Sequence, residues 1–72
     1  MTTSQQDLQN DPYRLAIVAA ERLRAALAVH GLAIPSLRGG HPAVSTPMVE
    51  LGGCSADVAE ALAAVLERVD PA

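Results

Sequence analysis

Apolar positions along the chain form two helical patterns, separated by a stretch that is rich in glycine and proline. The first pattern runs from about Pro12 to Val29 and the second from about Ala56 to Val69. Apolar residues at helical spacing indicate amphipathic helices, and short apolar runs between glycines and prolines indicate strands. This layout predicts a small α-β-β-α domain of the α+β class, with a two-stranded antiparallel hairpin packed on two amphipathic helices.

The first helix has recognisable signals at both ends. Asp11 is a good capping residue, and Pro12 suits the first helical position because its missing N–H would be unpaired there in any case. We expect Gly31 to end the helix as a left-handed cap, with Leu32 packing back on Leu27.

A broad stripe of this helix is expected to face the core. It comprises Ala16, Ala19, Leu23, Ala26, Leu27 and His30, with Leu15 at its edge. Ile17, Val18 and Val29 lie outside the stripe, so the helix has more apolar surface than one contact face requires. Ile17 and Val18 are therefore our candidate interface residues.

Two short strands are expected between the helices. The segment Leu32–Leu37 forms the first, with Pro35 at a sheet edge because proline has no N–H to donate. Arg38–Pro47 is expected to be a loop, and Met48–Leu51 a second strand with alternating faces. The alternative is a helical hairpin with an irregular middle.

The second helix has the cleanest amphipathic pattern in the chain. Ser55 is its expected cap, Asp57 complements the helix dipole in the first turn, and Asp70-Pro71 ends it. The stripe that should enter the core has Leu62 at its centre and comprises Val58, Leu62, Val65, Leu66 and Val69.

Length and composition favour a single small domain that needs help to stay folded. The polar residues 1–10 are expected to be a disordered tail before a domain of residues 11–70. The chain has 72 residues, half of them apolar, but no Phe or Trp and a single Tyr. Cys54 is alone, so no intramolecular disulfide can form, and no cluster of metal ligands is evident. Self-association, most simply as a homodimer, is the remaining source of stability.

Targeting signals and cofactor motifs are not evident. The first ten residues have neither the positive nor the apolar region of a signal peptide, and no apolar run is long enough to span a membrane. We therefore expect a cytoplasmic protein without a cofactor.

Three residues could carry chemistry, although a structural role is the better interpretation for each. Cys54 precedes a helix start, where the dipole can favour a thiolate, but it is more simply a small buried residue that fills space. His41 could partner it in a thiol enzyme, yet so short a chain offers little pocket. His30, at the end of the first helix, lacks neighbours that could complete a metal site.

Arg14, Arg22 and Arg24 form the one basic cluster of the chain. As a nucleic-acid contact they would need more positive charge than a chain of net charge −3 supplies. Glu21 can pair with Arg24 one turn on, so a solvated helix face is the better interpretation.

The chain resembles small uncharacterised proteins of streptomycetes and related actinobacteria, which are often encoded near plasmid or integrative-element genes. The resemblance covers about Ala19 to Val69, and its motifs are the stretches AERLRAAL at 20–27, GLAIPSL at 31–37 and VELGGC at 49–54. It implies a cytoplasmic actinobacterial or mobile-element setting, and it assigns no functional residue.

These observations favour a non-enzymatic protein-interaction module, homodimeric, with an accessory or regulatory role. A nucleic-acid-associated regulator that binds as a dimer through Arg14, Arg22 and Arg24 is the alternative. A thiol enzyme that uses Cys54 is the weakest of the three.

Overall fold

The computed structural model describes residues 11–68. In chain order they form α2 (Pro12–Val29), β1 (Arg38–Gly39), β2 (Val49–Glu50) and α3 (Ala56–Glu67). The predicted α+β class and the α-β-β-α order are confirmed. The predicted tail, residues 1–10, lies outside the described residues, as do Val69 and the Asp70-Pro71 stop signal.

Both helices begin at the predicted caps. The Asp11 Oδ1 atom accepts a hydrogen bond of 2.9 Å from the Tyr13 backbone N–H. The Ser55 Oγ atom accepts one of 3.2 Å from the Val58 N–H. Each bond satisfies a backbone donor that the first turn of a helix leaves unpaired.

The end of α2 is a Schellman motif, as the Gly31 signal predicts. Gly31 has φ +71°, and its N–H donates to the Ala28 carbonyl at 3.0 Å, while the Leu32 N–H donates to the Leu27 carbonyl at 2.9 Å. Leu32 also packs against the core cluster that contains Leu27. This is the apolar contact that usually accompanies the motif.

The first strand is displaced from its predicted position. The segment Leu32–Leu37 is not a strand, because the Leu37 N–H donates to the Ile34 carbonyl at 3.1 Å and closes a turn with Pro35 at its second position. Proline favours that position because its ring fixes a suitable φ. The chain becomes extended one residue later, inside the predicted loop Arg38–Pro47, where β1 forms.

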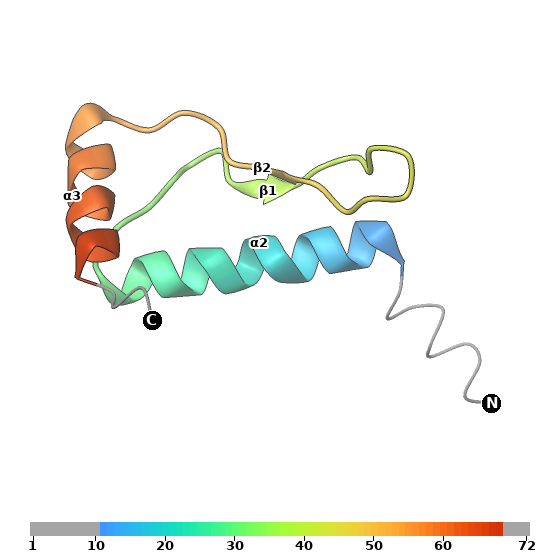
Figure 1. The fold of residues 1–72 in the computed structure, drawn as a ribbon, viewed down its shortest axis with the longest axis horizontal. Helices are drawn as coiled ribbons and strands as arrows, with labels where there is room; N and C mark the ends of the chain where they lie inside the picture. The colour runs from blue at the N-terminus through green and yellow to red at the C-terminus, as the bar shows by residue number, and fades with distance from the viewer. Residues whose placement is uncertain (1–10, 69–72) are drawn as a thin grey trace.

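The hairpin is antiparallel and has the register Arg38↔Glu50 and Gly39↔Val49. Its second strand lies inside the predicted segment Met48–Leu51. The loop closes in a tight turn in which the N–H groups of Ala43 and Thr46 bond each other's carbonyls at 3.0 and 2.9 Å. The whole hairpin lies along one side of α2 (Figure 1).

The buried face of α2 is rotated from the predicted stripe. Its buried residues are Ala16, Ala20 and Leu27. Of the predicted core residues, Ala16 and Leu27 are therefore confirmed, whereas Ala19, Leu23, Ala26 and His30 are exposed. The hairpin selects the face on which its backbone can come closest: a Cβ placed on Gly39 would lie 3.0 Å from the Ile17 nitrogen.

The α3 helix stands across the C-terminal end of α2 and beyond the hairpin (Figure 1). It contributes to the core through Leu62, which packs against the cluster of Ala20, Leu27 and Leu37. The helix has no buried residue within Ala56–Glu67, and Leu66 of the predicted stripe is 62% exposed. The small core therefore covers the predicted stripe incompletely.

Candidate functional site

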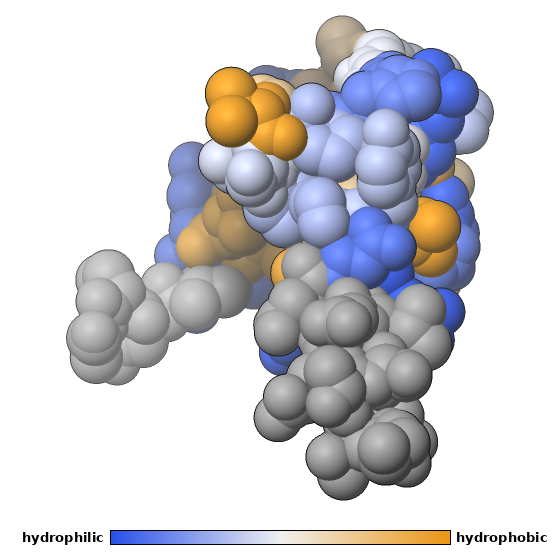
Figure 2. Space-filling model, turned by 90° about the vertical axis from the view of Figure 1, so that its right-hand side faces the viewer, coloured by the Kyte–Doolittle hydropathy of each residue, from blue (hydrophilic) through white to orange (hydrophobic). Residues whose placement is uncertain are grey.

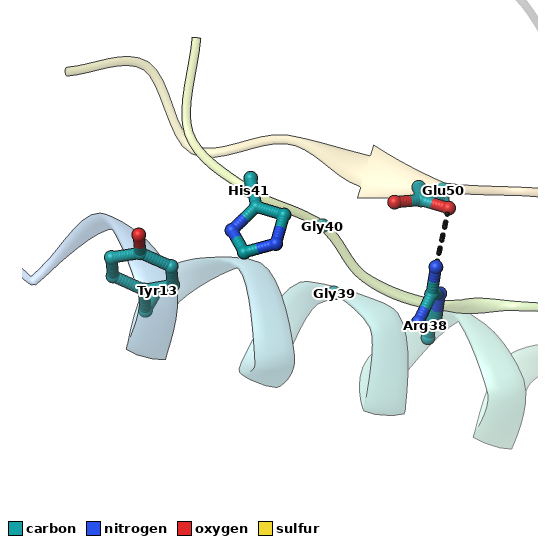
Figure 3. A pocket seen from close by; sticks show the side chains of 6 residues that line it. All are labelled: Tyr13, Arg38, Gly39, Gly40, His41 and Glu50. Carbon is teal, nitrogen blue, oxygen red and sulfur yellow. Dashed lines mark hydrogen bonds and ion pairs between the residues drawn. The ribbon is translucent and has the colours of Figure 1, made fainter. Parts of the chain in front are cut away.

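A small hollow lies between the first turn of α2 and the hairpin (Figure 3). Its volume is about 120 Å³, and its lining residues are Tyr13, Arg38, Gly39, Gly40, His41 and Glu50. Pockets for small organic ligands typically measure about 300–1,000 Å³, so this hollow is too small for such a ligand.

The side chains of the hollow are largely occupied with one another. Arg38 and Glu50 face each other across the two strands, with 3.0 Å between Arg38 Nη2 and Glu50 Oε1. The rings of Tyr13 and His41 meet edge to face, with centroids 6.0 Å apart and an interplanar angle of 87°. The arrangement ties the hairpin to α2, since each aromatic pair of this kind contributes about 0.5–1.5 kcal/mol beyond area burial.

The two residues of the hypothetical thiol site are not brought together. His41 lies on the hairpin above the start of α2, whereas Cys54 directly precedes α3, at the opposite end of the molecule (Figures 1 and 3). The expectation that Cys54 is a buried space-filling residue is wrong, because Cys54 is exposed. Gly52, two residues before it, has φ +71°.

His30 is the C-terminal cap residue of α2 and is exposed. Within residues 11–68, no three His, Cys, Asp or Glu side chains are grouped so as to hold a metal ion. No helix among those residues is both long and apolar enough to cross a membrane.

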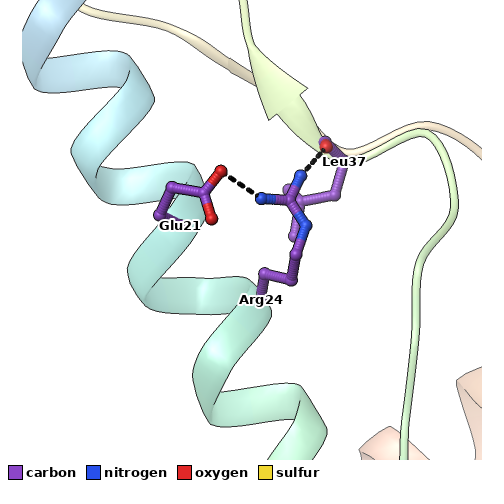
Figure 4. Close-up of polar contacts among 3 residues, drawn as sticks. All are labelled: Glu21, Arg24 and Leu37. Carbon is purple, nitrogen blue, oxygen red and sulfur yellow. Dashed lines mark hydrogen bonds and ion pairs between the residues drawn. The ribbon is translucent and has the colours of Figure 1, made fainter.

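The three arginines of α2 do not share a face. Arg22 and Arg24 are two positions apart, which separates them by about 200° around the helix. Arg24 is held in place: its guanidinium donates to the Leu37 carbonyl and contacts Glu21 Oε1 at 2.5 Å (Figure 4). The predicted Glu21–Arg24 pair is thus confirmed, and Arg24 joins α2 to the start of β1.

The candidate interface residues are on the surface. Ile17 is 55% exposed and Val18 is 52% exposed. Viewed from the end of the molecule that carries the hairpin loop, several apolar patches interrupt a mainly hydrophilic surface (Figure 2). Other large apolar side chains that are exposed within residues 11–68 are Tyr13, Leu15, Leu23, Val29, Val44, Met48, Leu51 and Leu66.

Sequence reasoning did not find the Tyr13–His41 contact or the Arg38–Glu50 pair. Both depend on the hairpin register, and the predicted strand boundaries did not contain that register. The available signal was Tyr13, the single aromatic residue of the sequence, which lies two positions after the Asp11 cap. An isolated ring near a helix start needs a packing partner.

Comparison with known proteins finds no family model, curated protein or solved structure that matches this chain.

Proposed function

We propose that this chain is a non-enzymatic protein-interaction module that acts as a homodimer in an accessory or regulatory role. The observation that carries the proposal is that few apolar side chains are buried in the core while many large ones remain exposed on the surface. Within residues 11–68 four side chains are buried, namely Ala16, Ala20, Leu27 and Leu37. Two of these are alanines, which bury little apolar area.

Such a core gives a single copy little stability. Domains of this size commonly need a disulfide, a metal or a partner to remain folded. Cys54 has no second cysteine to pair with. The apolar side chains left on α2 and α3 are available for burial by a partner, which would add the missing hydrophobic stabilisation.

The proposal is tested by the dependence of folding on protein concentration. We expect sedimentation equilibrium to show a dimer in the micromolar range. We also expect the thermal midpoint to rise with protein concentration, because association stabilises only the folded state. A monomer whose midpoint is the same at all concentrations across this range would overturn the homodimer.

The nucleic-acid alternative draws less support, because Arg24 is engaged by Leu37 and Glu21 and lies away from Arg22. Arg14 and Arg22 alone would release few counterions from a polyanion. We expect the module to act in the cytoplasm, and the mobile-element setting remains an expectation from the sequence.

A further inference from the structure

One exposed face of α2 is complementary to itself. It consists of Arg14, Ile17, Val18 and Glu21, spaced i, i+3, i+4 and i+7, and we call it the outer face of α2. Residues at this spacing lie on one side of a helix. All four are exposed, whereas Ala16, Ala20 and Leu27 of the same helix are buried.

The charges of the outer face are placed symmetrically about its apolar centre. Arg14 and Glu21 are seven residues, or about two turns, apart. The midpoint between them falls between Ile17 and Val18. If a second helix of the same sequence lies antiparallel across that midpoint, Arg14 of each copy lies beside Glu21 of the other. One two-fold axis therefore generates two ion pairs around an apolar centre.

A parallel arrangement is disfavoured by the same charges. It would place Arg14 beside Arg14 and Glu21 beside Glu21, and like charges at close range repel. Arg14 makes no ion pair among residues 11–68, so its guanidinium is available. Glu21 already contacts Arg24 through Oε1, and its second carboxylate oxygen can accept from another guanidinium.

We propose that a second copy of this chain docks antiparallel on the outer face of α2, with Ile17 and Val18 at the two-fold axis and Arg14 paired with Glu21 of the other copy. This inference rests on the proposed homodimer and names its surface and its orientation.

The test is a charge exchange read by sedimentation velocity. Arg14→Glu and Glu21→Arg each replace two attractive contacts per dimer by two repulsive ones, so each should raise the dimer dissociation constant at least about tenfold. An equimolar mixture of the two variants should form a heterodimer with about wild-type affinity, because both contacts again join opposite charges, one in the wild-type sense and one with its signs exchanged.

Arg22→Glu is the matched control, since it makes the same charge change on α2 at a position that would lie level with uncharged Tyr13 of the other copy, and it should change the dissociation constant less than about threefold. Glu21→Arg also removes the Arg24 contact, so circular dichroism melting must accompany it. Arg14→Glu breaks no ion pair among residues 11–68, and a negative charge near a helix start is favourable. The comparison of Arg14→Glu with Arg22→Glu therefore stands even if Glu21→Arg fails to fold.

The outcomes separate this inference from the function on which it rests. A wild-type chain that is monomeric throughout the micromolar range overturns the homodimer itself. A wild-type dimer that Arg14→Glu weakens no more than Arg22→Glu keeps the homodimer and overturns this interface. A dimer that Arg14→Glu strengthens also overturns the proposal, because the antiparallel arrangement requires residue 14 to attract Glu21 of the other copy.

Discussion

The Gly39 backbone lies directly on the Ile17 backbone. A Cβ placed on Gly39 would be 3.0 Å from the Ile17 nitrogen and 3.3 Å from its Cα atom. The hairpin therefore rests on α2 at a point where neither partner has room for another atom. Because Ile17 also presents its side chain to solvent, one turn of α2 both seats the hairpin and forms part of the proposed docking face.

Gly39→Ala should destabilise the domain. The added methyl meets helix backbone, which cannot move aside as a flexible side chain can, so we expect a loss of about 1–3 kcal/mol. Gly53→Ala is the control, since a Cβ there meets nothing within 4 Å. Thermal melts of the two variants at one protein concentration should differ by several degrees. Equal midpoints would mean that the hairpin does not sit on α2 as described.

Two glycines with the same backbone angle separate conformational strain from crowding. Gly31 and Gly52 both have φ +71°, but a Cβ on Gly52 would lie 2.2 Å from the Ser36 Cβ, whereas one on Gly31 meets nothing within 4 Å. Gly31→Ala should cost about 1–2 kcal/mol from the left-handed conformation alone. Gly52→Ala should cost clearly more in denaturant unfolding. If Gly31→Ala proves the more harmful, the Gly52–Ser36 contact is not formed.

Replacing Leu27 of α2 and Leu62 of α3 by alanine should show which helix contributes more to the stability of the core. Leu27 is 3% exposed, so Leu27→Ala should cost about 2–5 kcal/mol. Leu62 is half-buried at the edge of the same cluster, so Leu62→Ala should cost about 1–2 kcal/mol. Urea titrations of both variants measure the difference, and a larger loss for Leu62→Ala would place the core centre on α3.

Arg24→Ala should weaken the connection between α2 and β1. The guanidinium donates to the Leu37 carbonyl, but its side chain is 45% exposed, so water screens the interaction and the expected cost is about 1 kcal/mol. Arg22→Ala removes an arginine from the same helix that forms no ion pair in the described part of the chain, and it should change the free energy of unfolding by less than about 0.5 kcal/mol. Hydrogen exchange at the β1 amides should rise in the first variant and not in the second.

Cys54→Ser should leave the fold unchanged. The thiol is exposed, so the substitution buries no new hydroxyl, and we expect a thermal midpoint within about 1 °C of the wild type. A thiol reagent should label folded Cys54 at a rate close to that of a free cysteine. Labelling much faster than this control would indicate an activated thiolate and would favour the thiol-enzyme alternative.

The sequence alone determined where the helices begin and where α2 ends. Asp11 with Pro12, Gly31 and Ser55 act through bonds to backbone groups within a few residues, so their effect is the same in any tertiary surrounding. The class and order of elements followed from these boundaries. The surplus of apolar positions, including exposed Ile17 and Val18, also followed from the helical spacing.

The tertiary structure alone decided which face of α2 is buried and where β1 lies. Several faces of α2 are apolar, so periodicity could not choose among them. The buried face was decided by the close approach of Gly39 to the α2 backbone. This approach needs small residues, Ala16 and Ala20, beneath the hairpin. The pairing of Arg38 with Glu50 depends on the hairpin register, and the contact of Tyr13 with His41 depends on where the hairpin lies on α2. These contacts join residues far apart in the chain, and local propensities do not specify them.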